Sequence, residues 1–201
     1  PIVRKIYRHR TLPYILNRIR LSAWQLLHPG APWLPRPLIQ FMESVLLEQS
    51  NVLEWGGGRS TIWFLRRAKS VFTVESDAGW VTEILNRVTA EGLDQEKQFN
   101  LRYAPLDEFD QSSPEYVICP AIESDGNFDL ILVDGKLRSS CAHLALKLIR
   151  PGGYLIIDDA HRYLPVSSTL LPDALKISYE QMSVDWQMFW EKINGMKITT
   201  F

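Results

Sequence analysis

Few features of this 201-residue chain point to a membrane or to secretion. It contains only two cysteines, Cys119 and Cys141, and their spacing matches neither a metal site nor a redox pair. No apolar run approaches the ~18 residues that cross a bilayer, and the first residues lack the apolar core of a secretory signal. These absences predict one domain in the reducing cytoplasm, with both thiols free.

Acidic residues are absent from the first forty positions, which hold seven basic ones, although the whole chain has a net charge of −1. We expect residues 1–36 to form a basic arm that can contact nucleic acid, an anionic membrane or an acidic partner. The alternative is a solvated helix that packs Ile15, Ile19 and Trp24 on the body. Nucleic acid is disfavoured, because no aromatic stacking platform accompanies the arginines. A weak contact of the arm with an anionic membrane is a further hypothesis, and the sequence indicates no oligomeric state.

From residue 37 onward, strand-like and helix-like segments alternate. Strands are expected at 52–55, 71–74, 98–104, 128–133 and 154–157, with amphipathic helices between most of them; the strand at 98–104 alternates polar and apolar residues more than the others. This rhythm predicts a doubly wound α/β fold whose parallel sheet is covered on both faces. Two further strand-like stretches, 176–182 and 196–201, have no convincing helix between them. They predict an antiparallel hairpin at the edge of the sheet.

The most informative segment is the glycine turn at the end of the first strand. Gly56, Gly57 and Gly58 have no Cβ, so a ligand can touch the backbone there. Ser60 is positioned to cap the next helix, whose first amides favour electron-rich ligand groups. Glu75 ends the second strand 19 residues after Gly56, where a carboxylate can accept both hydroxyls of a ribose. Together these features predict a nucleoside-bearing cofactor.

Two cofactors compete for this turn. A dinucleotide fingerprint needs G-x-G-x-x-G, and Thr61 stands where its last glycine belongs. Glu54 lies inside the strand end, where a buried carboxylate needs a strong hydrogen-bond donor. The ammonium of an amino acid would supply such a donor, and a dinucleotide would not. The pattern therefore favours a cofactor that carries an amino-acid part over NAD; an NAD cofactor would imply an oxidoreductase.

At these residues the chain resembles the class I S-adenosylmethionine-dependent methyltransferases. Glu54-x-Gly56-x-Gly58 matches the first motif of that family, Glu75 its ribose-binding acid, and Leu-Ile-Arg-Pro-Gly-Gly at 148–153 its signature before the fifth strand. The resemblance covers roughly residues 38–201 and implies an enzyme with a seven-stranded sheet, in which the last strand is antiparallel. Ser60 replaces the third glycine of the family's motif. The expected cofactor contacts are Glu54, Gly56, Gly57, Gly58, Ser60, Thr61, Glu75, Ser76, Asp107 and Asp134.

Three aspartates follow the fourth and fifth strands: Asp134 after the fourth, and Asp158 and Asp159 after the fifth. Neighbouring parallel strands lie about 4.8 Å apart, so these carboxylates can converge on a divalent cation such as Mg²⁺. The arrangement resembles that of cation-dependent O-methyltransferases, including sugar-modifying ones, in which the ion lowers the pKa of the acceptor hydroxyl. Against this, successive strand residues point to opposite faces. Either Asp158 or Asp159 could instead cap a helix.

Without a metal ion, a hydroxyl acceptor needs a general base. His161, three residues beyond Asp158, is the best-placed histidine for that role; a surface or helix-capping histidine is the alternative. We therefore predict a methyltransferase that acts on a hydroxyl of a small molecule or carbohydrate, with Asp134, Asp158 and His161 in catalysis. The other hypotheses are a nucleic-acid methyltransferase that uses the basic arm, an NAD-dependent oxidoreductase and a non-catalytic cofactor-binding module.

Overall fold

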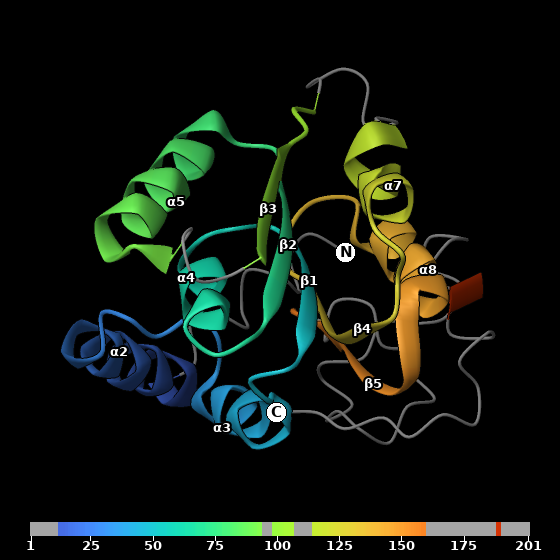
Figure 1. The fold of residues 1–201 in the computed structure, drawn as a ribbon. Helices are drawn as coiled ribbons and strands as arrows, with labels where there is room; N and C mark the ends of the chain where they lie inside the picture. Colours follow the sequence, from blue (N-terminus) through green and yellow to red (C-terminus); the bar gives the residue numbers. More distant parts are fainter. Residues whose placement is uncertain (1–11, 94–97, 107–113, 160–187, 190–201) are drawn as a thin grey trace.

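The computed structural model describes residues 12–93, 98–106, 114–159 and 188–189. The elements follow one another as α2 (Leu12–Leu27), α3 (Arg36–Val45), β1 (Asn51–Trp55), α4 (Arg59–Leu65), β2 (Ser70–Glu75), α5 (Ala78–Glu91), β3 (Gln98–Tyr103), α7 (Pro114–Glu123), β4 (Phe128–Val133), α8 (Arg138–Leu148) and β5 (Ile149–Ile157). Strands and helices thus alternate from β1 to β5 (Figure 1).

The five strands form one parallel sheet in the order β3-β2-β1-β4-β5. β1 lies at its centre, paired with β2 on one side and with β4 on the other. This topology confirms the predicted α/β fold with a parallel sheet. The strands predicted at 176–182 and 196–201 lie outside the described residues, so the seven-stranded sheet and its terminal hairpin stay predictions.

Helices cover both faces of the sheet, so that β1 is buried on both sides. α3, α4 and α5 pack on the face that carries Val52, and α7 and α8 on the face that carries Trp55. In Figure 1, α4 and α5 lie to the left of the sheet, and α7 and α8 to the right. Cys119 of α7 and Cys141 of α8 are buried and free, as predicted. Because side chains alternate along β1, Glu54 lies on the same face as Val52 and points toward α4.

Local signals place the ends of α5 correctly but not the start of β5. The carboxylate of Asp77 accepts a hydrogen bond from the backbone N–H of Trp80 at 2.9 Å, and Gly92 ends the helix with a φ of +66°. We expected residues 150–153 to form a turn before the strand. Instead β5 already begins at Ile149, and an irregular register in its pairing with β4 accommodates the Pro-Gly-Gly stretch.

The start of α4 also differs from the prediction. The helix begins at Arg59, with Gly58 as its N-cap. Ser60 therefore lies in the first turn, where its side chain is buried, and it does not cap the helix. The hydroxyl of Thr61 accepts the cap bond from the backbone N–H of Gly58 at 3.0 Å.

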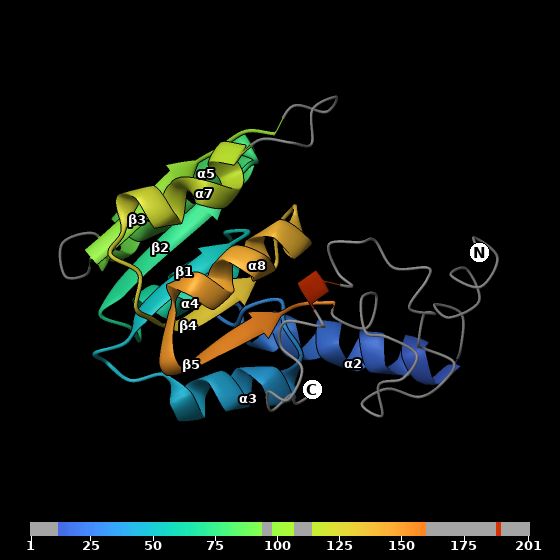
Figure 2. The same ribbon diagram turned by 90° about the vertical axis from the view of Figure 1, so that its right-hand side faces the viewer.

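The basic arm contributes one described helix, α2, which packs only in part. Trp24 lies half-buried against the core, and α2 lies next to α3 in both views (Figure 1 and Figure 2). Ile19 is 59% exposed, which contradicts its expected packing on the body, and Leu26 and Leu27 are also exposed. Of the helices that the structure describes, none combines the length and apolar character needed to cross a membrane. The division into an arm at 1–36 and a domain at 37–201 stays a prediction.

Candidate functional site

The carboxyl ends of β1, β2, β4 and β5 meet at one edge of the sheet. The chain leaves β1 toward β2 and leaves β4 toward β5, in opposite directions. The crevice at such a reversal is where open α/β sheets bind their ligands. Backbone hydrogen bonds tie the turns together at this edge: Gly56 N to Val74 O at 2.9 Å, Asp134 N to Trp55 O at 2.9 Å, and Asp158 N to Val133 O at 3.1 Å.

Two of the three glycines in the turn after β1 are needed because neighbouring protein atoms leave no room for a side chain. Gly56 has a φ of +95°, and a Cβ there would lie 2.5 Å from the backbone nitrogen of Gly135. A Cβ on Gly57 would lie 2.7 Å from Cγ2 of Thr73. Gly58 has an extended backbone with room for a Cβ, whose nearest neighbour would be 3.7 Å away. The turn after β1 therefore lies directly against the turn after β4.

Glu54 is fully buried and only half-satisfied. Its Oε2 accepts hydrogen bonds from the hydroxyls of Thr61 at 2.6 Å and Thr73 at 3.2 Å. Its Oε1 has no hydrogen-bond partner among the described residues. Burial raises the pKa of Glu54 from 4.5 to about 7, although the hydroxyls of Ser60, Thr61 and Thr73 lower it in part. A buried carboxylate oxygen is thus left for a strong donor, such as the ammonium of a ligand.

Glu75 lies at the tip of β2 and is held by backbone amides. Its Oε1 accepts hydrogen bonds from the N–H groups of Ser76 and Asp77, both at 2.7 Å. Burial raises the pKa of Glu75, while the amides of Asp77, Ser76 and Gly57 lower it in part. These amides fix the orientation of the carboxylate at the position that the sequence predicts for ribose binding.

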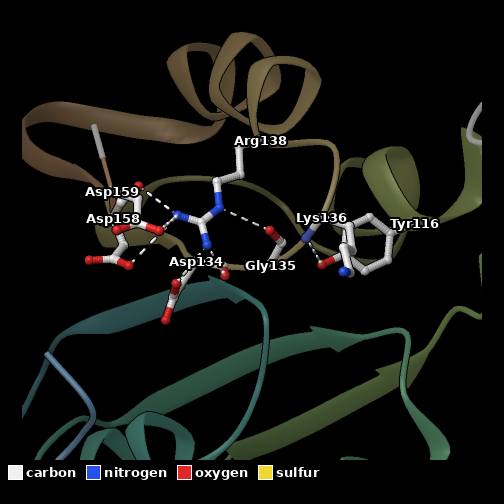
Figure 3. Close-up of polar contacts among 7 residues, drawn as sticks. All are labelled: Tyr116, Asp134, Gly135, Lys136, Arg138, Asp158 and Asp159. Atoms are coloured by element: carbon white, nitrogen blue, oxygen red, sulfur yellow. Dashed lines mark hydrogen bonds and ion pairs between the residues drawn. The ribbon is translucent and has the colours of Figure 1, made fainter. Parts of the chain in front are cut away.

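Asp134, Asp158 and Asp159 come together, and Arg138 of α8 lies among them (Figure 3). The guanidinium nitrogens lie 3.0 Å from Oδ1 of Asp134, 3.7 Å from Oδ2 of Asp158 and 4.0 Å from Oδ2 of Asp159. β5 has ended at Ile157, and Asp159 adopts a φ of +54° in the turn that follows. The two neighbouring aspartates can therefore face the same group.

The predicted metal site at these three aspartates needs correction. The carboxylates converge on a cation that the chain itself supplies, and a divalent ion between them would have to displace Arg138. Among the described residues, no three His, Cys, Asp or Glu side chains are arranged to hold a metal ion. The residues present do not fit that ion. Burial and the neighbouring Asp158 raise the pKa of Asp134, and Arg138 counters this only in part.

Two predicted site residues, Asp107 and His161, lie outside the described residues. Two others were missed. Thr73 stands opposite Glu54 in the pairing of β1 with β2, and this register only becomes visible in the sheet. Arg138 follows Asp134 by four residues, a spacing typical of an ion pair on a helix, but its contact with Asp158 depends on which strand lies next to β4.

A cavity of about 180 Å³ lies between Gly58 of the glycine turn and α5. It contacts the turn only at Gly58, and neither the glutamates nor the aspartates of the site line it. It is therefore separate from the carboxylates described above. The lining residues are Trp33, Gly58, Arg59, Trp80, Glu83, Ile84 and Arg87.

Comparison with solved structures agrees with this architecture. No protein-family model and no curated protein matches the chain. A methyltransferase-like protein from Silicibacter pomeroyi has a TM-score of 0.55 at 23% identity, over 64% of this chain and 73% of that one. The O-methyltransferase TomG from Streptomyces achromogenes, solved with S-adenosylmethionine, has a TM-score of 0.53 at 20% identity, over 82% of this chain and 70% of that one. The protein therefore has the fold of the class I S-adenosylmethionine-dependent methyltransferases.

Proposed function

We propose that this protein transfers a methyl group from S-adenosylmethionine to a hydroxyl of a small molecule or carbohydrate. The proposal is carried by two buried carboxylates, Glu54 and Glu75, which flank the glycine turn of a methyltransferase fold. Within the described residues, their hydrogen bonds come from hydroxyls and backbone amides, and not from Lys or Arg. The negative charge of this half of the site is thus available to a ligand.

Each glutamate has a distinct role toward the donor. Glu75, at the tip of β2, accepts hydrogen bonds from the ribose hydroxyls. Glu54 accepts the ammonium of the amino-acid part through Oε1, the oxygen without a partner among the described residues. When it is bound, S-adenosylmethionine supplies the electrophilic methyl group. A dinucleotide carries no ammonium and would leave this oxygen unpaired, which favours S-adenosylmethionine over NAD.

The acceptor hydroxyl needs a group that takes its proton. Asp134 and Asp158 follow adjacent strands beside the glycine turn, and burial together with the neighbouring Asp158 raises the pKa of Asp134. A raised pKa makes the ionised Asp134 a stronger base toward the proton of an attacking hydroxyl. TomG is named as an O-methyltransferase, which supports an oxygen acceptor by analogy of fold. His161 stays the alternative base.

Donor binding is tested by calorimetry with S-adenosylhomocysteine and with NAD. We expect S-adenosylhomocysteine to bind and NAD not to bind. Replacing Glu75 by Ala should weaken binding by about 1–3 kcal/mol, because it removes charge-assisted hydrogen bonds to the ribose. Glu48→Ala, at an exposed glutamate outside the site, is the control and should bind normally. Tighter binding of NAD, or unchanged affinity in Glu75→Ala, would contradict the donor assignment.

The acceptor class is tested by methyl transfer from labelled S-adenosylmethionine. Phenols, sugars, RNA and DNA are offered in parallel, and mass spectrometry locates the added methyl group. We expect transfer to a hydroxyl compound, with a large loss of kcat in Asp134→Asn. Transfer to a nucleic acid would instead favour the basic arm as a substrate-binding element. Tight binding of S-adenosylhomocysteine without transfer to any acceptor would favour a non-catalytic module.

The exposed side of α2 favours one additional role, contact with an anionic membrane. Leu26 and Leu27 are 83% and 79% exposed, and no acidic residue occurs before Glu43. An apolar surface in a basic segment suits the interface of an anionic bilayer. Vesicles that contain phosphatidylserine should bind the full chain at low salt, and more weakly after Leu26→Gln and Leu27→Gln. Equal binding of the variant, or equal binding to neutral vesicles, would remove this role.

A further inference from the structure

The guanidinium of Arg138 lies where the loops after β4 and β5 meet (Figure 3). Its Nε donates to the carbonyl of Gly135 at 3.0 Å, its Nη2 to that of Asp134 at 2.8 Å, and its Nη1 to that of Asp158 at 2.6 Å. Only 17% of the side chain is exposed. One side chain of α8 therefore ties together the ends of two neighbouring strands.

The same guanidinium supplies positive charge to the acidic cluster of Asp134, Asp158 and Asp159. Three carboxylates in one place repel one another, and the ionised form of each is stabilised by a nearby cation. Arg138 lies within 4.0 Å of all three. Its planar fork sends donors in several directions at once, which a single ammonium nitrogen of lysine cannot do.

The loop that Arg138 holds also contacts the part of the site proposed to bind the methyl donor, which consists of the glycine turn, Glu54 and Glu75 and is called the donor half below. A Cβ on Gly135 would lie 2.8 Å from the backbone nitrogen of Gly56, so the loop after β4 is pressed against the glycine turn. From α7, the hydroxyl of Tyr116 accepts a hydrogen bond from the N–H of Lys136 at 3.1 Å. Arg138 and Tyr116 thus hold this loop at two successive residues, Gly135 and Lys136. Any movement of the loop would change the distance between the carboxylates of Asp134 and Asp158 and the bound methyl donor.

We propose that Arg138 is a positioning residue and the built-in cation of the acceptor half of the site. It holds Asp134 and Asp158 beside the methyl donor, and it lies where a divalent ion would have to bind. The inference depends on the proposed function for the identity of the donor. The arrangement of the charges themselves does not depend on it.

Removal of Arg138 should convert the cluster into a metal-responsive site. Without the guanidinium, three carboxylates and the carbonyl oxygens of Asp134, Gly135 and Asp158 would surround an open space. Oxygen atoms in such numbers are the ligands that Mg²⁺ and Mn²⁺ prefer. A response to either ion in Arg138→Ala, absent from the wild type, would be specific to this arrangement.

The first experiment measures thermal unfolding of the full chain with EDTA, Mg²⁺ or Mn²⁺. We expect the wild type to be unaffected by the ions. Arg138→Ala should melt roughly 5–10 °C lower, because the carboxylates lose their cation. Mn²⁺, or guanidinium ion compared with equal NaCl, should restore part of the loss. Arg150→Ala is the matched control, since Arg150 joins Asp129 at the opposite ends of the same two strands, and it should show no response to the ions.

The second experiment measures affinity for S-adenosylhomocysteine by calorimetry in EDTA. Arg138→Ala should bind roughly tenfold more weakly than the wild type, with recovery in Mn²⁺. Arg138→Lys keeps the charge but loses the fork, and its affinity should fall between those of the wild type and Arg138→Ala. Arg150→Ala should bind normally. A role limited to stability would not make the affinity for the donor depend on a cation.

Two results would overturn the inference. One is stabilisation of the wild type by Mn²⁺ that Asp158→Asn removes, because an ion would then bind with Arg138 in place. The other is an Arg138→Ala protein with the melting temperature and donor affinity of the wild type. If that variant does not fold, Arg138→Lys decides, since wild-type affinity there would exclude positioning by the fork. Failure of the wild type to bind S-adenosylhomocysteine would refute the proposed function, and the thermal experiment would still test Arg138.

Discussion

Carboxylates end the strands in both halves of the sheet edge, but the protein satisfies them in two different ways. In the donor half, at β1 and β2, Glu54 and Glu75 receive hydrogen bonds from hydroxyls and backbone amides. In the acceptor half, at β4 and β5, Asp134 and Asp158 face the guanidinium of Arg138. Uncharged hydrogen-bond donors leave the negative charge of the glutamates available to a positively charged ligand. The guanidinium of Arg138, by contrast, neutralises the aspartates that it contacts. Acidic residues at strand ends therefore indicate a metal site only where the chain supplies no counter-ion.

The two halves meet at the backbones of Gly56 and Gly135, and this contact gives the largest expected effect. Gly56→Ala should destabilise the protein by about 3 kcal/mol or more, because a Cβ at φ +95° is strained and would collide with backbone atoms that cannot move aside. Gly58→Ala is the matched control, and its destabilisation should stay below about 1 kcal/mol, since a Cβ there meets only an ordinary contact. Denaturant unfolding measures both. Equal stabilities would mean that the two turns do not press against each other.

A second prediction concerns the pH dependence of the donor half. Burial raises the pKa of Glu54 to about 7, so the folded protein binds more protons than the unfolded chain between about pH 4.5 and 7. Stability should therefore fall as the pH rises through this window. Glu54→Gln is neutral at every pH, and it should be more stable than the wild type by up to about 3 kcal/mol at about pH 8. Unfolding free energies at several pH values measure the difference.

The same substitution separates stability from function. Wild-type affinity for S-adenosylhomocysteine should rise with pH up to about 7, as Glu54 becomes able to pair with the ligand ammonium. Glu54→Gln should bind more weakly and without this pH dependence. A variant that is less stable at alkaline pH, or that binds as tightly as the wild type, would remove the assigned role of Glu54.

The smallest effect is expected at the opposite ends of β4 and β5. Arg150 pairs there with Asp129, but its side chain is 46% exposed, and solvent screens such a pair. Arg150→Ala should change the free energy of unfolding by less than about 1 kcal/mol. Asp129 also keeps its hydrogen bond from the backbone N–H of Asn51 at 2.7 Å. If Arg150→Ala destabilised the protein as much as Arg138→Ala, the ion pairs of Arg138 would be no more important to stability than the exposed pair at the opposite ends of these strands.

Much of the framework could be predicted from local patterns. The inner strands β1, β2 and β4 follow from their apolar runs, because a strand buried on both faces is largely apolar, whereas β3 at the edge of the sheet alternates polar and apolar residues. The ends of α5 follow from Asp77 and Gly92, since caps depend on neighbouring residues only. Ser60 shows the limit of such signals. It is a common capping residue, yet the helix begins one residue before it, and its side chain is buried in the first turn instead.

The sequence by itself determined the glycine turn, the glutamates beside it and the aspartates after the fourth and fifth strands, because residue type and spacing along one strand suffice to place them. Only the tertiary structure decided what surrounds each carboxylate. Thr73 reaches Glu54 through the pairing of β1 with β2, and Arg138 reaches Asp158 through the pairing of β4 with β5. Such contacts join residues that are neighbours only after the sheet has formed. The tertiary structure therefore decides which carboxylates are paired with a cation of the chain and which remain available to a ligand.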